Sequence, residues 1–250
     1  MITLRGLTKK FGSFTAVDSL DLTVRQGELF GFLGPNGAGK TTTLKMMAGV
    51  LKPTSGRIVI DNKDLALDPI GCKRVVGFIP DSPFLYDKLT GTEVLQFIAG
   101  IYELPGNGLK ERMEHLFDLF EIGPWRDELI ESYSHGMKQR LVMTTALIHQ
   151  PRVLIVDEPM VGLDPRAARL VKGIFRTLSR KGVTIFMSTH TLQVAEEMCD
   201  RIGIIHQGRL IALGTMSELR EMSGLKVEQL EEVYFRLTGV EEDASREVEI

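Results

Sequence analysis

The chain has 250 residues, of which 43% are hydrophobic and 25% are charged. These proportions are typical of a globular protein that buries a large core without staples such as disulfides. The net charge of −3 argues against nucleic acid as the main partner, because proteins that bind a phosphate backbone usually have a basic excess. The chain has only two cysteines, Cys72 and Cys199, so neither a disulfide framework nor a cysteine zinc site is expected.

No segment predicts secretion or passage through a membrane. Met1–Thr8 lacks the basic stretch and apolar run that mark a signal peptide. The longest uncharged stretch, Gly182–Ala195, is interrupted by polar residues, whereas a membrane-spanning helix needs about 20 mostly apolar residues. We therefore expect a chain that does not cross a membrane by itself.

The opening segment, Ile2–Val24, predicts antiparallel strands with turns at Phe11-Gly12 and Asp18-Ser19. Further along the chain, unbroken apolar runs end at polar residues. Such runs, separated by long helical stretches, are typical of parallel strands buried on both faces. The four runs are Leu29–Leu33, Val75–Ile79, Val153–Val156 and Val183–Met187.

Polar side chains follow each of these runs. In an open α/β sheet, ligands bind outside the carboxyl ends of the parallel strands. We therefore expect distant parts of the sequence to meet in one site there. The residues expected to converge are Lys40, Asp81, Asp157, Glu158 and His190.

Between the second and third runs lies a long insertion, Pro83–Gln150, which predicts a mostly helical lobe attached to the sheet. Its segments with helical spacing are Thr92–Tyr102, Leu109–Ile122 and Met137–His149. Near the end of the sequence, Lys226–Leu237 predicts an amphipathic helix. Glu241–Ile250 holds five acids and one arginine and predicts a solvated acidic tail.

The segment Gly34–Thr41 matches the phosphate-binding pattern G-x-x-x-x-G-K-[ST]. Its glycines allow backbone N–H groups to wrap phosphate oxygens at the start of a helix. We expect Lys40 to reach the β- and γ-phosphates of a nucleotide and the Thr41 hydroxyl to coordinate Mg²⁺. The residues expected to bind the nucleotide here are Gly34, Pro35, Asn36, Gly37, Ala38, Gly39, Lys40, Thr41 and Thr42.

Asp157 and Glu158 end the third apolar run. The carboxylate of Asp157 can hold Mg²⁺ directly or through water, and Glu158 can polarise an attacking water as general base. An acid after a strand is usually structural, but the presence of a phosphate loop favours the functional interpretation.

A phosphate loop alone does not distinguish kinases, GTPases and ATPases, but three further motifs do. Tyr133–Arg140 resembles the signature motif, usually written L-S-G-G-Q, of the ATP-binding cassette (ABC) family. Gly162–Pro165 resembles the D-loop of that family, and Ser188–His190 resembles the segment with its switch histidine. Phe11 falls where the family places an aromatic ring that stacks on adenine. The resemblance covers about residues 2–215, with the motifs in the expected order.

This resemblance implies an α/β fold with a P-loop NTPase (RecA-like) core, an N-terminal antiparallel β subdomain and an inserted helical subdomain. It implies an ABC nucleotide-binding domain over residues 1–215, with the helical subdomain at about 83–150. A C-terminal helical extension with the acidic tail would follow over residues 216–250.

The resemblance also implies that two cassettes pack head to tail around each ATP. Ser134 and Gly136 would then contact the γ-phosphate bound by the opposite chain, and His190 would contact the γ-phosphate and the attacking water. Asp164 would help to join the halves. Without the family context, Ser134 would be interpreted as a simple helix N-cap. The residues expected to be catalytic are Glu158, His190 and Lys40.

The sequence departs from the family pattern at two places. His135 and Met137 replace the commoner Gly and Gln of the signature, and signatures of this kind resemble those of bacterial exporters. Asp81 occupies the position usually filled by Gln in the Q-loop. We expect Asp81 to contribute to the metal site together with Thr41 and Asp157, or to serve as the hinge through which a membrane partner senses the nucleotide.

The sequence therefore predicts an ATPase with ATP and Mg²⁺ as cofactors, acting as a subunit of a bacterial ABC transporter, most simply an exporter. Its expected partners are a transmembrane permease subunit and a second cassette, identical or related, and its expected location is peripheral, on the cytoplasmic face of the cell membrane. An alternative is a regulatory cassette that acts on ribosomes or DNA. Another is a nucleotide-dependent switch without turnover, which Glu158 and His190 argue against.

Overall fold

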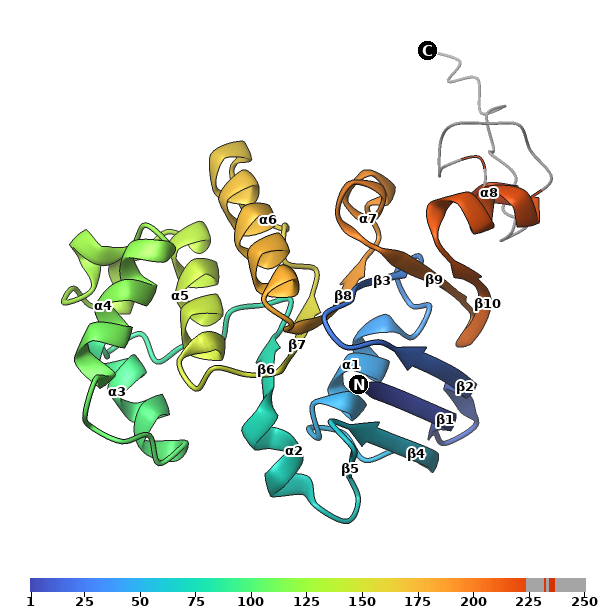
Figure 1. Cartoon of the computed structure of the whole chain (residues 1–250), viewed down its shortest axis with the longest axis horizontal. Helices are drawn as coiled ribbons and strands as arrows, with labels where there is room; N and C mark the ends of the chain where they lie inside the picture. Colours follow the sequence, from blue (N-terminus) through green and yellow to red (C-terminus); the bar gives the residue numbers. More distant parts are fainter. Residues whose placement is uncertain (224–231, 233, 237–250) are drawn as a thin grey trace.

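The computed structural model describes residues 1–223, 232 and 234–236. In this part of the chain, two β-sheets are joined to a helical lobe (Figure 1). The strands are β1 (Ile2–Phe11), β2 (Phe14–Val24), β3 (Leu29–Leu33), β4 (Ser55–Ile60), β5 (Lys63–Asp64), β6 (Val76–Ile79), β7 (Val153–Asp157), β8 (Thr184–Thr189), β9 (Arg201–His206) and β10 (Arg209–Gly214). The helices are α1 (Lys40–Met47), α2 (Pro69–Val75), α3 (Gly91–Ile101), α4 (Leu109–Leu119), α5 (His135–Leu147), α6 (Pro165–Arg180), α7 (Leu192–Met198) and α8 (Met216–Ser223), with 3₁₀ turns η1 (Gly123–Trp125) and η2 (Ile130–Ser132).

The first sheet is four-stranded, in the order β2-β1-β4-β5, and all its pairs are antiparallel. The predicted turn after Phe11 is confirmed, because Phe11 pairs with Phe14 across it. The predicted turn at Asp18-Ser19 is wrong. These residues lie inside β2, where Ser19 has a φ of 50° and the register with β1 shifts. An extra residue in one strand of a pair produces such a bulge and bends the strand without reversing it.

The second sheet has six strands in the order β10-β9-β3-β8-β7-β6. All its neighbours pair in parallel except β10, which is antiparallel to β9. The four predicted apolar runs form β3, β6, β7 and β8. β8 does not stop at Met187 as predicted, since Ser188 and Thr189 are buried and continue the register with β3. A polar residue continues a buried strand when its own groups find hydrogen-bond partners.

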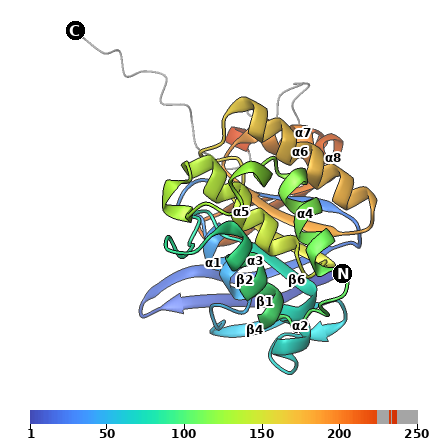
Figure 2. The same ribbon diagram turned by 90° about the vertical axis from the view of Figure 1, so that its left-hand side faces the viewer.

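The predicted helical lobe contains α3, α4 and α5 and lies beside the second sheet (Figures 1 and 2). α4 ends at Leu119 rather than Ile122, because Glu121 adopts a positive φ of 52°, which a right-handed helix does not allow. α5 begins at His135, two residues earlier than predicted, because the Ser134 side chain caps its N-terminus. One hydrophobic cluster joins the lobe to the sheet, with Phe117 and Leu141 from the lobe and Leu154 from β7 among its members.

The last described elements are β10 and α8. The predicted amphipathic helix Lys226–Leu237 lies outside the described residues except for Glu232 and Tyr234–Arg236, and the acidic segment 241–250 lies wholly outside them. Among the helices of the described ranges, none has the length and apolar character needed to span a bilayer. Both cysteines are free thiols, as the sequence predicts.

Candidate functional site

The loop between β3 and α1 wraps tightly because two of its glycines have no room for a side chain. A Cβ atom at Gly34 would lie 2.4 Å from the carbonyl oxygen of Ile205. Gly39 has a φ of 104°, and its Cβ would lie 2.4 Å from the carbonyl oxygen of Ala16. Any side chain at either position would clash with backbone atoms, so the loop requires glycine there. This loop directs the N-terminus of α1, which begins at Lys40, toward the carboxyl edge of the sheet.

Lys40 places its ammonium group inside the loop. The side chain is only 6% exposed, and Nζ donates to the carbonyl oxygens of Gly34 at 2.7 Å and Pro35 at 3.2 Å. The same Nζ lies 3.5 Å from Oε1 of Glu158. A lysine held at the positive end of a helix, within a curl of backbone, makes this loop a site for an anion.

Asp157, at the end of β7, is 1% exposed. Its Oδ1 accepts a short hydrogen bond from the Ser188 hydroxyl, and its Oδ2 has no hydrogen-bond partner. Burial raises the pKa of Asp157 above its usual range, although the hydrogen bond from Ser188 and the neighbouring Thr41 hydroxyl act in the opposite direction. A carboxylate oxygen without a partner beside the Thr41 hydroxyl is a pair of hard oxygen ligands, as Mg²⁺ prefers. The residues present therefore fit a magnesium ion.

Glu158 follows Asp157 with a φ of 48°. A non-glycine residue in this region is strained, and such strain occurs most often at functional sites. The residue is held there by its N–H, which donates to the Ser188 hydroxyl at 3.2 Å. Its Oε1 lies 3.0 Å from Nδ1 of His190, and its Oε2 accepts from the His190 N–H at 3.4 Å. The turn thus directs the carboxylate toward both Lys40 and His190.

A pocket of about 310 Å³ opens in front of the loop. Phe11 and Asp81, which are far apart in the sequence, both line it. The Asp81 carboxylate accepts a hydrogen bond from the Ser82 N–H at 2.9 Å. Gly34, Ala38, Asp157 and His190 are not among the residues that line this pocket. Its lining consists of Phe11, Phe14, Ala16, Pro35, Asn36, Gly37, Gly39, Lys40, Thr41, Thr42, Asp81 and Glu158.

Two residues of the site were missed by the sequence analysis. Ser188 bonds to Asp157, but a serine inside an apolar strand gives no signal of this contact. Phe14 is 62% exposed and lines the pocket with Phe11, which is 49% exposed. The hairpin pairing of these two phenylalanines was the signal that could have identified Phe14.

Ser134 and Gly136 are not among the residues that line this pocket. Ser134 is exposed at the start of α5, where its hydroxyl accepts from the Met137 N–H at 3.3 Å. The signature segment packs on the D-loop, because a Cβ added to Gly162 would meet the ring of His135 at 2.3 Å. Asp164 caps α6 by accepting from the Ala167 N–H at 2.8 Å. These residues form a second polar surface, separate from the phosphate loop.

A sequence profile described as ABC transporter matches residues 17–161 of the chain. The chain belongs to the ABC transporter family. Membership in this family confirms the predicted class, that of ATP-binding cassette ATPases. The match begins at Val17 in β2 and extends to Val161, past the signature and Glu158.

Relatives support the same assignment. The chain is 39% identical over 223 residues to the probable multidrug ABC transporter ATP-binding protein YbhF of Escherichia coli, covering 89% of this chain but only 38% of that protein. It is 37% identical over 219 residues to the Nod factor export ATP-binding protein I of Ralstonia nicotianae, covering 88% of this chain and 68% of the relative. The chain thus spans less than half the length of YbhF.

Solved structures confirm the predicted fold. An ATP-binding subunit of an ABC transporter superposes with a TM-score of 0.90 and 33% identity, covering 95% of this chain and 99% of the other. The ATP-binding cassette MJ0796, in a dimeric post-hydrolysis state bound to ADP and Pi, superposes with a TM-score of 0.79 and 26% identity. The match covers 86% of this chain and 99% of the MJ0796 chain.

Proposed function

We propose that this chain is the MgATP-hydrolysing subunit of a bacterial ABC exporter and works as one half of a cassette pair. The observation that carries the proposal is the position of Glu158. Its carboxylate lies within 3.5 Å of Lys40 and 3.0 Å of His190, at the mouth of the phosphate loop. An anion site with an adjacent carboxylate base has what phosphoryl transfer to water requires.

Lys40 and the loop would bind the β- and γ-phosphates, with Phe11 stacking on the adenine. Phe14, on the same hairpin, would supply a second apolar face. Glu158 would accept the proton of the attacking water, and His190 would hold the γ-phosphate and orient Glu158. Lys40 donates to loop carbonyls in this structure, and its exchange of these partners for phosphate oxygens would retain charge-assisted hydrogen bonds.

Mg²⁺, when bound, would supply positive charge that offsets the negative charge of the phosphates during the reaction. Thr41 and Asp157 would hold it, with Asp81 adding charge from the pocket wall. Asp157 suits this role because it is buried while one of its oxygens lacks a partner. The Ser188 hydroxyl bonded to the other oxygen fixes the orientation of the carboxylate.

The second half of each site would come from another cassette. Ser134 is exposed at a helix N-terminus and lies outside the pocket that Lys40 lines, so it is available to a phosphate bound by a different chain. Gly136 lets the backbone of the same turn approach that phosphate, and Asp164 would lie at the interface. The dimeric form of the MJ0796 cassette supports this arrangement.

We assign residues 1–215 to the nucleotide-binding domain, with its helical subdomain at about 83–150, and residues 216–250 to an extension. The boundary near 215 follows the last strand of the second sheet, β10. The partner in the membrane would be a permease subunit, with the chain peripheral on the cytoplasmic face. The names of the relatives, a probable multidrug transporter protein and an export protein, support export.

The variant Glu158→Gln tests this proposal. The amide keeps the size of the side chain but cannot accept the proton, so turnover should fall by about 100-fold or more while ATP affinity stays near that of the natural chain. Phosphate release and titration with a fluorescent ATP analogue measure the two effects. With MgATP, size-exclusion chromatography should show a stable dimer. Turnover within twofold of the natural chain would refute the role of Glu158.

A further inference from the structure

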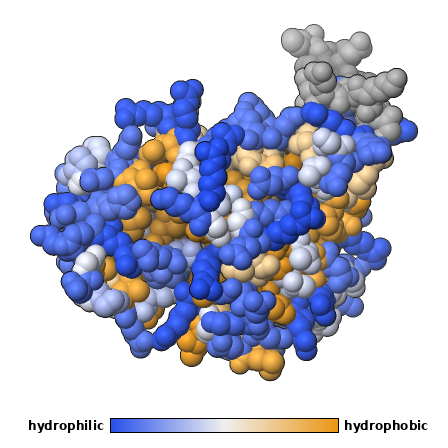
Figure 3. All heavy atoms as spheres, in the orientation of Figure 1, coloured by the Kyte–Doolittle hydropathy of each residue, from blue (hydrophilic) through white to orange (hydrophobic). Residues whose placement is uncertain are grey.

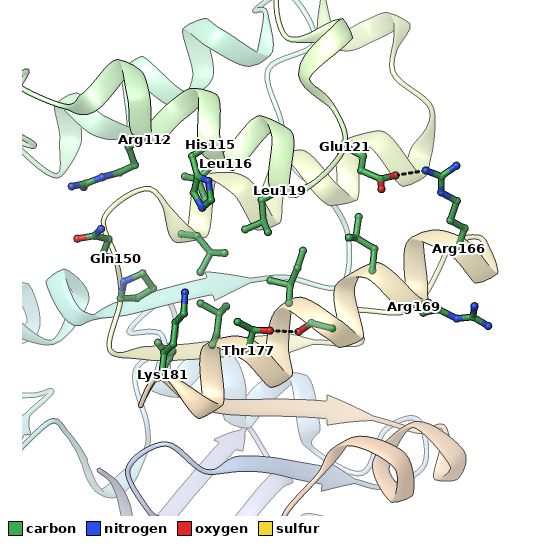
Figure 4. Close-up of a pocket in the computed structure, with 17 residues that line it drawn as sticks. Arg112, His115, Leu116, Leu119, Glu121, Gln150, Arg166, Arg169, Thr177 and Lys181 are labelled. Carbon is green, nitrogen blue, oxygen red and sulfur yellow. Dashed lines mark hydrogen bonds and ion pairs between the residues drawn. The ribbon is translucent and has the colours of Figure 1, made fainter.

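A second, larger cavity lies away from the nucleotide pocket. It is a groove of about 990 Å³ between α4 and α6. Figure 3 shows it as a hydrophobic hollow bordered by hydrophilic side chains, and Figure 4 shows the walls from which its lining residues extend. The apolar floor consists of Leu116, Leu119, Leu170, Ile174, Leu178 and Val183. None of the residues proposed for ATP binding lines this groove.

The rim of the groove is basic. Arg112, Arg166, Arg169 and Lys181 line it together with His115, against one acid, Glu121. Glu121 is already paired with Arg166 at 3.0 Å. Residues 165–181 contain six basic residues and no acid, although the whole chain has a net charge of −3. The groove therefore fits an occupant with acids along one side and apolar groups along the other.

We propose that the acidic segment 241–250 of the same chain docks in this groove. Its sequence ends Glu247-Val248-Glu249-Ile250. In an extended strand, alternate side chains point to opposite faces, so Glu247 and Glu249 would face one side and Val248 and Ile250 the other. The apolar side chains would rest on the leucine floor, and one of the two carboxylates would reach Lys181 at the rim.

The segment can reach the groove. The last described residues leave the fold beside α7 and α8, since Tyr234 packs against the cluster that contains Ala195 and Leu219. Salt bridges join α8 to α7 (Arg220 to Glu196, 3.1 Å) and α7 to α6 (Glu197 to Lys172, 2.5 Å), and Figure 1 shows the three helices in a row with α7 in the middle. Two spacings of packed helices, from α8 to α7 and from α7 to α6, amount to about 20 Å, whereas residues 237–246 can span about 33 Å when extended.

Docking here would connect α6, which begins at the D-loop, to α4 of the helical lobe. His115 from α4 and Lys181 from the end of α6 extend toward the groove from opposite walls (Figure 4). A strand seated between them would contact both walls at once. The occupant would thus restrain movement of the lobe relative to the sheet.

Zero-length cross-linking of the full chain tests the proposal. A carbodiimide joins a lysine amine to a carboxylate in contact with it, so mass spectrometry of the digest should identify an amide between Lys181 and Glu247 or Glu249. Lys181→Arg keeps the positive charge but cannot form this amide and is the matched control. Mixing unlabelled and ¹⁵N-labelled chains separates links within one chain from links between chains. The readout requires no ATP hydrolysis, so it is independent of the proposed activity.

The account predicts links within one chain, lost in Lys181→Arg. Val248→Asp should lower their yield by about tenfold, because it removes one buried apolar contact. Val240→Asp adds the same charge outside the alternating run and should leave the yield unchanged. No link from Lys181 to residues 241–250, or links only between labelled and unlabelled chains, would overturn docking by the segment of the same chain. Equal yields in the two aspartate variants would overturn the proposed register.

Discussion

The sheet edge around Lys40 and the start of α5 at Ser134 differ in how many of their polar side chains already have partners within the chain. At the sheet edge, Lys40 and Asp157 are almost fully buried, and they are bonded to Gly34 in the loop after β3 and to Ser188 of β8 respectively. At the start of α5, Ser134 is exposed, and the hydrogen bond that its side chain makes in the described structure is a cap to its own helix. The first region is assembled by strand pairing within the chain. The second faces outward and gains a phosphate to bind only when another molecule supplies it.

This difference has a physical basis. Parallel strands in register bring their carboxyl ends to a common edge, so residues from distant sequence positions meet whenever the sheet forms. A helix N-terminus has free N–H groups wherever it lies, and it becomes part of a site only when an anion reaches it. The two regions should therefore respond differently to substitution. Substitutions in the first region should affect the ATP affinity or turnover of the same chain. Substitutions in the second region should affect the turnover of the ATP bound by the partner chain.

Removing Lys40 would be the largest disruption of the sheet-edge region. In Lys40→Ala, the loop loses its only buried cation among the described residues, and ATP affinity should fall on the order of 100-fold because charge-assisted hydrogen bonds to phosphate disappear. Lys45→Ala, on the exposed side of the same helix, is the control and should bind normally. Equilibrium titration with a fluorescent ATP analogue measures both. An affinity within twofold of the natural chain would contradict the loop assignment.

Ser134→Arg should leave ATP affinity of the isolated chain unchanged while turnover falls on the order of 100-fold, because a bulky cation replaces the contacts to the γ-phosphate of the partner. Ser132→Arg places the same charge on a neighbouring exposed serine and should retain turnover. Phosphate release at saturating ATP measures the effect. If both variants hydrolyse ATP equally, α5 has no role in the site.

Substitution of Asp81 should have a smaller effect on hydrolysis, since this residue is exposed at the pocket wall. Asp81→Ala should raise the Mg²⁺ concentration needed for half-maximal hydrolysis by about two- to fivefold, as expected for one exposed charge. Asp81→Asn should show the same shift if charge alone is responsible. Unaltered Mg²⁺ dependence, with loss of permease-stimulated activity, would assign the residue to coupling instead.

Substitution of His149, which connects the helical lobe to the sheet, should have the smallest effect, and this effect is on the stability of the fold. Its ring stacks on Tyr102 with centroids 3.9 Å apart, and its Nε2 lies 3.0 Å from the carbonyl oxygen of Val76. Burial lowers the pKa of His149, so between that pKa and the ordinary value near 6.5 the unfolded chain binds more protons than the folded chain. The contribution of the partly buried, neutral His149 ring to the free energy of unfolding is therefore present above about pH 6.5 and is lost as the pH falls.

His149→Gln should cost about 1 kcal/mol at pH 8 through lost stacking, and its deficit relative to the natural chain should shrink toward pH 5. Thermal unfolding of both proteins across this range measures the difference. A deficit that is constant with pH would show that His149 does not titrate differently in the folded state.

Motifs and long apolar runs predict their part of the fold correctly. The loop around Lys40 and the strand before Asp157 are local patterns with a fixed geometry, and both are confirmed in position. The bulge at Ser19 was missed because it depends on the register with β1, and Ser188 was missed because its contact comes from a strand 31 residues away. The groove was also missed, since it depends on how α4 and α6 pack.

Some of the site residues follow from the strand pattern, whereas others depend on the family resemblance. Residues such as Glu158 and His190 were predicted to converge from the order of strands, and the structure places them 3.0 Å apart. The role of Ser134 rests on the family resemblance, because a serine before a helix is ordinarily a cap and acts as one here. The local contacts of a single chain cannot reveal a contribution to another molecule.

If each ATP is shared between two cassettes, a mixture of Lys40→Ala and Ser134→Arg chains should regain activity that neither variant has. Each variant alone should be inactive. In a mixed dimer, one site combines the intact loop of the Ser134→Arg chain with the intact signature of the Lys40→Ala chain. With equal amounts and random pairing, about a quarter of the natural turnover should return if the two sites act independently. No recovery in a mixed dimer verified by differential tagging would contradict the shared site.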